Sequence, residues 1–84
     1  MNRQQSAARE NLPTLLVMHN VCVAGNRTTV RLEPIIWDAL QDIASAQGVS
    51  IHVLVTEIDR DRTTINLSSA IRAFVVTDLL ARVA

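Results

Sequence analysis

Residues 27–40 read Arg27-Thr28-Thr29-Val30-Arg31-Leu32-Glu33-Pro34-Ile35-Ile36-Trp37-Asp38-Ala39-Leu40, and this stretch decides the fold. Up to Leu32 the side chains alternate between two faces, which is typical of a β-strand, and after Pro34 the apolar positions follow a helical period. The strand places Arg27, Thr29 and Arg31 on one face, while the other face is fit for burial. Arginine and threonine in such a row can reach base edges and phosphates. Taken alone, this alternation favours the merely solvated face of an antiparallel strand, whereas together with the helical pattern around it the alternation favours a nucleic-acid-binding strand.

A first helix is predicted to begin at Pro34, a residue favoured at the first helical position, and to end at Gly48 as a left-handed cap. Its apolar stripe contains Ile36, Trp37, Leu40, Ile43 and Ala44. We therefore expect Trp37 in the core, and not as an exposed platform for stacking bases.

Two further helices are predicted downstream. Ser50 is a good N-cap for a helix from Ile51 to about Asp61, with Leu54, Val55 and Ile58 facing inward. A loop over residues 63–66 leads to a third helix, for which Asn66, Ser68 and Ser69 are candidate caps. The apolar stripe of this third helix contains Ile71, Phe74, Val75, Leu79 and Val83.

The segment before Arg27 leaves two interpretations open. Residues 21–24 are β-prone and Gly25-Asn26 is a turn signal, so the chain forms either a short hairpin or an extended lead-in to the main strand. Residues 1–13 show no periodicity, and we expect them to be a flexible arm. Residues 14–84 are expected to form a single domain.

Size and composition predict an oligomer without a membrane span. A domain of 84 residues with 49% hydrophobic content has more apolar surface than one small core can bury, which favours a symmetric homodimer. Apolar runs stop at four residues, far short of the roughly 18 needed to cross a bilayer. No secretory signal follows the first residues, and Cys22 is the only cysteine, so we expect a cytoplasmic protein.

Charge is distributed unevenly although the net charge is zero. Residues 1–31 hold four arginines against one acidic residue, whereas residues 32–84 hold four arginines against seven acidic residues. All basic residues are arginine, which suits bidentate contacts to guanine or phosphate. Binding energy for DNA would then come from a few arginines rather than from a broad basic surface.

The sequence contains no pattern that indicates catalysis or cofactor binding. His19, His52 and Cys22 are too few and too scattered for a metal site, and no catalytic triad or phosphate-cradling glycine loop is present. An aromatic content of 2% also argues against recognition of single strands by stacking. We expect no enzyme, no metal and no cofactor.

The order of elements resembles the ribbon-helix-helix superfamily of bacterial and phage repressors over about residues 25–61. The motifs Gly25-Asn26-Arg27-Thr28-Thr29-Val30-Arg31-Leu32-Glu33-Pro34, Trp37-Asp38-Ala39-Leu40 and Asn66-Leu67-Ser68-Ser69-Ala70-Ile71-Arg72 are similar to a small bacterial subfamily with an added C-terminal helix. This extends the resemblance to about residue 80.

The resemblance implies a mainly α fold with one short strand, in an intertwined homodimer whose strands pair into an intermolecular antiparallel ribbon. It implies base contacts from Arg27, Thr29 and Arg31, and a phosphate at the start of the second helix. That phosphate site maps to Val49, Ser50 and Ile51, where free amides and the helix dipole favour an anion. The implied dimer core is Val30, Leu32, Ile36, Trp37, Leu40, Ile43, Leu54 and Ile58.

Two functions follow from these expectations. The leading one is sequence-specific binding of double-stranded DNA by a transcriptional repressor without catalysis. The alternative is a dimeric protein-interaction module, similar to an antitoxin or an adaptor, that holds another protein through the third helix. The neutral net charge and that additional helix favour the alternative.

Overall fold

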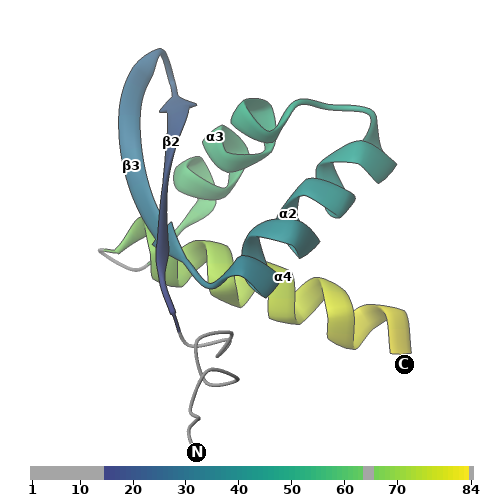
Figure 1. The fold of residues 1–84 in the computed structure, drawn as a ribbon. Coiled ribbons are helices and arrows are strands. Elements are labelled where there is room, and N and C mark those ends of the chain that lie inside the picture. The colour runs from purple at the N-terminus through teal and green to yellow at the C-terminus, as the bar shows by residue number, and fades with distance from the viewer. Residues whose placement is uncertain (1–14, 64–65, 84) are drawn as a thin grey trace, which may run out of the picture.

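The computed structural model describes residues 15–63 and 66–83, and in it a hairpin is followed by three helices (Figure 1). The elements are β2 (Val17–Val23), β3 (Asn26–Leu32), α2 (Pro34–Gln47), α3 (Ile51–Asp61) and α4 (Leu67–Val83). All three helices lie on one side of the hairpin (Figure 1). The predicted mainly helical fold is confirmed. The expected N-terminal arm over residues 1–13 lies outside the described residues.

The hairpin resolves the open question about the segment before Arg27. β2 and β3 pair antiparallel within one chain, from Val17 opposite Leu32 to Val23 opposite Asn26. The turn is Ala24-Gly25, so the prediction of Gly25-Asn26 was wrong by one residue. Both turn residues have positive φ, 51° and 86°, as a two-residue type I′ connection requires.

Helix α2 has the ends that the sequence predicted. Glu33 precedes Pro34 in an extended conformation and makes no side-chain cap. Gly48 adopts a left-handed φ of 71°, and the amide of Val49 donates to the carbonyl of Ala44 over 3.0 Å. These bonds satisfy carbonyls that the last helical turn leaves without partners.

The starts of α3 and α4 are fixed by side-chain caps. Ser50 Oγ accepts from the amide of Val53 over 3.1 Å, as expected for its role as N-cap. Asn66 Oδ1 accepts from the amide of Ser69 over 3.1 Å, so Asn66 caps α4. The hydroxyl of Ser68, another candidate cap, accepts a bond from strand β3 instead.

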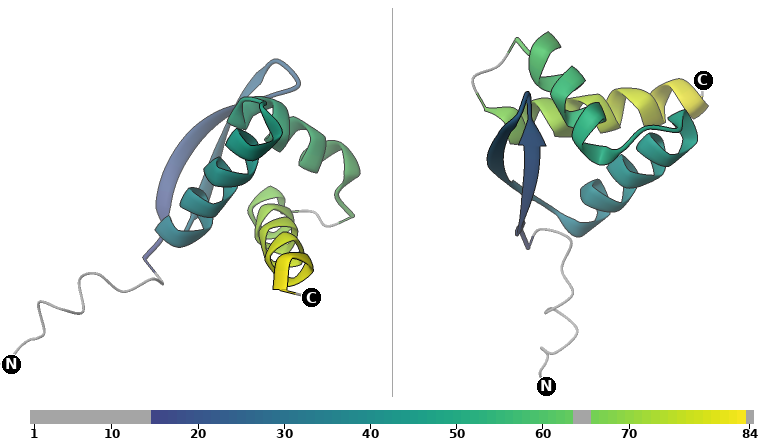
Figure 2. Two further views of the ribbon diagram at one scale, coloured as in Figure 1. Left: turned by 90° about the vertical axis from the view of Figure 1, so that its right-hand side faces the viewer. Right: turned by 90° about the horizontal axis from the view of Figure 1, so that it is seen from above.

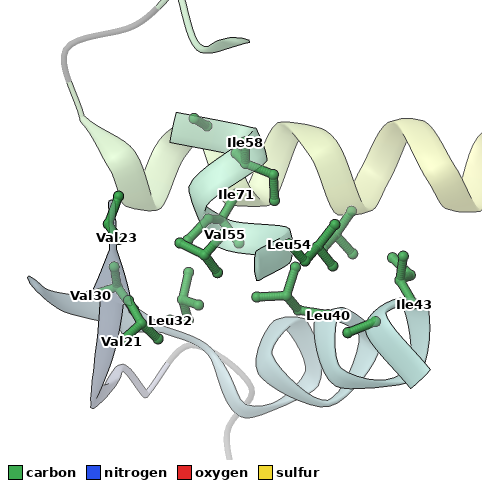
Figure 3. Packing of buried hydrophobic residues seen from close by; sticks show 13 residues of the cluster. Val21, Val23, Val30, Leu32, Leu40, Ile43, Leu54, Val55, Ile58 and Ile71 are labelled. Carbon is green, nitrogen blue, oxygen red and sulfur yellow. The ribbon is translucent and has the colours of Figure 1, made fainter. Parts of the chain in front are cut away.

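The hydrophobic core lies between the hairpin and the helices, and side chains from all five elements meet there (Figure 3). Its fully buried side chains are Leu32, Leu40, Leu54, Ile71, Val21, Val30, Val55 and Val75. Trp37 is half-buried and stacks on His19, with ring centroids 3.7 Å apart and planes 4° from parallel. Trp37 thus packs within the chain, as expected from the apolar stripe of α2.

Helix α4 is buried at its beginning and exposed toward its end. Ile71 and Val75 are fully buried, but Leu79 is 48% exposed and Val83 is 81% exposed. The end of α4 lies on the far side of the domain from the hairpin (Figure 2, right view). The predicted stripe is therefore core only in its first half. No helix in the described ranges is both long enough and apolar enough to cross a membrane.

Candidate nucleic-acid interface

The open face of the hairpin carries the residues predicted to contact bases. Arg27, Thr29 and Arg31 are exposed, while Val30 and Leu32 on the opposite face are buried. Strand geometry explains this, because successive side chains point to opposite faces and only one face is covered by helices. The structure therefore brings the three predicted base-contacting residues into one exposed row.

Strand β2 adds a second row that the sequence reasoning missed. Residues directly opposite each other in an antiparallel pair share a face, so Asn20, opposite Thr29, lies on the open face as well. The hydroxyl of Thr29 donates to Asn20 Oδ1 over 2.9 Å. A signal for this strand was present in the sequence Val17-Met18-His19-Asn20-Val21-Cys22-Val23, because its alternate positions are apolar or aromatic. We name the open face formed by Met18, Asn20, Cys22, Arg27, Thr29 and Arg31 the polar face.

Arg27 and Arg31 differ from the other arginines that the structure describes. Within residues 15–63 and 66–83 neither guanidinium lies within 4.0 Å of a carboxylate, and residues 15–32 contain no acidic residue. Each of the other described arginines forms an ion pair with an acidic residue of the same chain. These ion pairs are Arg60–Asp61 at 3.6 Å, Arg62–Asp59 at 2.8 Å, Arg72–Glu33 at 2.8 Å and Arg82–Asp78 at 2.7 Å.

Glu33 and Arg72 connect α4 to the strand that bears the polar face. Arg72 Nε donates to Glu33 Oε1 over 2.8 Å, and Arg72 Nη2 donates to the carbonyl of Arg31 over 3.2 Å. The hydrogen bond from Arg72, followed by a bond to the backbone of Glu33 itself, holds the pKa of the Glu33 carboxyl below its ordinary value. A charged Glu33 therefore helps to keep α4 against the end of β3.

The predicted phosphate site at the start of α3 is only partly free. The amide of Val49 already donates to the carbonyl of Ala44, and Ser50 Oγ accepts from Val53. Within the described residues neither the hydroxyl of Ser50 nor the amide of Ile51 donates a hydrogen bond, and both lie at a helix start whose dipole favours an anion. Helix α3 begins on the helical side of the hairpin (Figure 1), so one chain does not bring this site together with the polar face.

The residues predicted for a dimer core lie in the core of a single chain. Those that are buried are Val30, Leu32, Leu40, Ile43, Leu54 and Ile58, whereas Ile36 and Trp37 are half-buried. A single chain does not test whether they also contact a second copy. Their part in a dimer stays a prediction.

Metal ligands do not gather in the described part of the chain. No group of three or more His, Cys, Asp or Glu side chains lies close enough to hold an ion there. His52 instead accepts a hydrogen bond at Nδ1 from the amide of Cys22 over 3.0 Å. His19 stacks on Trp37, so both histidines have structural contacts.

Comparison with known proteins identifies the family. The chain matches the model of the ribbon-helix-helix domain over residues 16–79, which is most of its length, and it belongs to this family. Searches of the curated proteins and of the solved structures find no match. The family is typically one of DNA-binding regulators, and the match includes both hairpin strands and most of α4.

Proposed function

We propose that this ribbon-helix-helix protein is a homodimeric, sequence-specific binder of double-stranded DNA that represses transcription by occupying an operator. The polar face enters the major groove, where Arg27, Thr29 and Arg31 contact base edges. The major groove is about 12 Å wide and admits a two-stranded ribbon. Such a protein acts by equilibrium occupancy in the cytoplasm and needs neither catalysis nor a cofactor.

The observation that carries this proposal is the contrast between the arginines of β3 and those of the helices. An arginine in an ion pair must break that pair before it binds a phosphate or a base, whereas Arg27 and Arg31 have no carboxylate partner among the described residues. A guanidinium that is free on an exposed strand can form the bidentate contact with guanine. The zero net charge therefore understates the DNA-binding capacity of the hairpin.

The neutral net charge also limits how strongly the protein binds DNA of arbitrary sequence. Affinity from phosphate contacts falls with salt in proportion to the number of phosphates neutralised. If two arginines per chain carry binding in a dimer, the slope of log K against log salt should be no steeper than about −4. Specificity should then depend on the few base contacts of the polar face.

The test compares two double variants that remove the same charge. A site is first selected from random duplex DNA at a fixed salt concentration, and binding is then measured by fluorescence anisotropy. Arg27→Ala with Arg31→Ala should abolish specific binding, since each good bidentate contact contributes about 1–3 kcal/mol. Arg60→Ala with Arg82→Ala should bind as the parent does. Equal loss in both variants, or none in the first, would contradict the assignment of the polar face.

The exposed end of α4 favours a second candidate function, a protein-interaction module. Val76, Leu79, Leu80 and Val83 recur at helical spacing on one stripe and are 48%, 48%, 63% and 81% exposed. A stripe of this kind suits an apolar groove or helix of another protein. Recovery of a stoichiometric protein partner without DNA from the native host would favour this candidate over the first.

A further inference from the structure

A hollow of about 660 Å³ lies where the polar face meets the first turn of α4. Thr29 and Arg31 line it from β3, Ser68 and Arg72 line it from α4, and Leu16 lines it from the position just before β2. Helix α4 begins beside the end of β3, where Ser68 binds the amide of Arg31 (Figure 1). We name this space the edge hollow. Because Thr29 and Arg31 belong to both surfaces, the edge hollow is continuous with the polar face.

The edge hollow contains hydrogen-bond donors that no group of the described chain uses. The hydroxyl of Ser68 accepts from the amide of Arg31 over 3.2 Å but donates to no acceptor within the described residues. Arg72 uses Nε for Glu33 and Nη2 for the carbonyl of Arg31, which leaves its Nη1 without a partner in the same residues. Both side chains can therefore bind a ligand without breaking an internal hydrogen bond.

The charge of the edge hollow suits an anion with one negative charge. No acidic residue lines it within the described part of the chain. Glu33 offsets the charge of Arg72 over 2.8 Å, whereas Arg31 forms no ion pair with a described residue, so a single positive charge is left. A phosphate of the DNA backbone carries one negative charge, whereas a phosphate monoester carries about 1.5 to 2. The backbone phosphate is the better match.

A second hollow, of about 370 Å³ between α3 and α4, has the opposite character. Phe74 is among the apolar side chains that line it, and Glu57 and Asp61 line it as well. Its one arginine, Arg62, is bound to Asp59 over 2.8 Å. An anion in this second hollow would meet two carboxylates. The capacity to hold an anion is thus specific to the edge hollow and is not shared by both.

We propose that the edge hollow binds one phosphate of the DNA backbone, held by Ser68 and Arg72, when the polar face lies in the major groove. This inference rests on the proposed function and adds a DNA contact from the third helix. Phosphate contacts fix the orientation of a protein on the duplex without reading sequence. Ser68 and Arg72 also bind the backbone of Arg31, so a phosphate held by them would place Arg31 at a fixed position relative to the bases.

The first test places a charge in the edge hollow without removing a donor. Leu16 is 49% exposed, lines the edge hollow and lies outside the polar face. Leu16→Lys should raise the affinity for the selected duplex and Leu16→Glu should lower it, each by about two- to fivefold, as for an exposed ion pair. Leu80→Lys and Leu80→Glu are the matched controls for total charge, because Leu80 is 63% exposed near the end of α4, on the far side from the hairpin (Figure 2). Equal effects at the two positions would overturn the site.

The second test identifies the phosphate. Phosphates of the selected duplex are replaced by uncharged methylphosphonates, one symmetric pair of positions at a time. At one pair of positions the replacement should weaken binding of the parent by about tenfold, as expected for hydrogen bonds to a charged group. At these positions it should also abolish the difference in affinity between Leu16→Lys and Leu16→Glu. Persistence of that difference at every position would contradict a phosphate in the edge hollow.

The third test removes the ligands without changing the net charge. Arg72→Gln with Glu33→Gln deletes one ion pair, and Arg82→Gln with Asp78→Asn is the matched control on the same helix. The first variant should lose about tenfold in affinity for selected and random duplexes alike, because a phosphate contact carries no sequence information. The control should bind as the parent does. A loss confined to the selected duplex would show that Arg72 acts only through Arg31 and would overturn the phosphate contact.

A free phosphorylated molecule is the other source of the same chemistry. Sodium phosphate and sodium chloride at equal ionic strength should weaken binding of the parent to DNA equally. Stronger displacement by phosphate that disappears in Leu16→Glu would assign the edge hollow to a free anion and overturn the assignment to DNA. If the parent selects no duplex, the proposed function fails and this inference fails with it. If the parent binds its duplex but the Leu16 variants do not differ, only this inference fails.

Discussion

The two faces of the hairpin have opposite properties although their residues alternate along the same two strands. On the covered face Val30 and Leu32 are 2% and 0% exposed, and on the polar face Arg27, Thr29 and Arg31 are exposed. A shift of one residue would exchange the faces, because the side-chain period of a strand is two. Folding and the proposed recognition of DNA thus depend on neighbouring positions, so each can be altered while the other is kept.

The largest effect is expected when a charge is introduced on the covered face of the hairpin. Leu32→Asp would bury a carboxylate without a partner and should unfold the protein, since truncation of a buried leucine alone costs about 2–5 kcal/mol. Arg31→Asp is the matched control on the adjacent, exposed position and should retain the helical circular dichroism spectrum. If the two variants unfold at the same denaturant concentration, the distinction between the faces is wrong.

The next largest effect is expected from a variant that keeps the charge of the polar face but changes the geometry of its donor groups. Replacing Arg27 and Arg31 by lysine keeps the charge but removes the planar, bidentate donor group. We expect the double variant to retain its affinity for random DNA and its salt slope, while discrimination of the selected site falls by about tenfold or more per contact. Competition binding with selected and random duplexes measures both quantities. Unchanged discrimination would indicate that the arginines bind only phosphates.

A smaller effect is expected where α4 meets the end of β3. The folded-state pKa of Glu33 lies below its unfolded value, so its contribution to stability is fully present above the unfolded pKa and is lost as pH falls through the folded pKa. When the pH is lowered from 7 to below about 4.3, the free energy of unfolding should therefore fall less for Glu33→Gln than for the parent. Urea unfolding at several pH values measures this, and identical pH profiles would argue against the coupling.

The smallest effect concerns Asn20 on β2. Asn20→Ala removes the acceptor for the Thr29 hydroxyl, an exposed hydrogen bond. Affinity for the selected duplex should fall by about 1 kcal/mol or less, with stability nearly unchanged. Met18→Ala, at an exposed position two residues away on the same face, is the control. A larger loss than that of the arginine variants would make β2 the principal reading strand.

Local signals in the sequence were sufficient to predict where the helices lie. Pro34, Gly48 and Ser50 act on the backbone within a few residues of themselves, and α2 begins and ends, and α3 begins, where these residues predict. The turn was misplaced because Gly25-Asn26 is the stronger local signal, yet Ala24 takes the positive φ. Here a contact with α3 outweighs local preference.

The contacts that matter most for the candidate site were beyond sequence reasoning. Ser68 reaches Arg31 across 37 positions, and Arg72 reaches it across 41. No periodicity links such distant residues, so the attachment of α4 to the end of β3 could not be inferred. That Arg27 and Arg31 form no ion pair within the described residues could not be inferred either, because the count of charges does not say which charges form pairs.

The Ala24 turn has a consequence for the order in which the chain folds. A non-glycine residue at positive φ is uncommon, so this turn offers less local stabilisation than an Asn-Gly turn would. What holds Ala24 is the hydroxyl of Thr56, 32 positions later. The hairpin should therefore become stable only after α3 has docked, and pulse-labelled hydrogen exchange should show the amides of β2 protected no earlier than those of α3. The proposed DNA-binding surface would then be among the last parts of the domain to form.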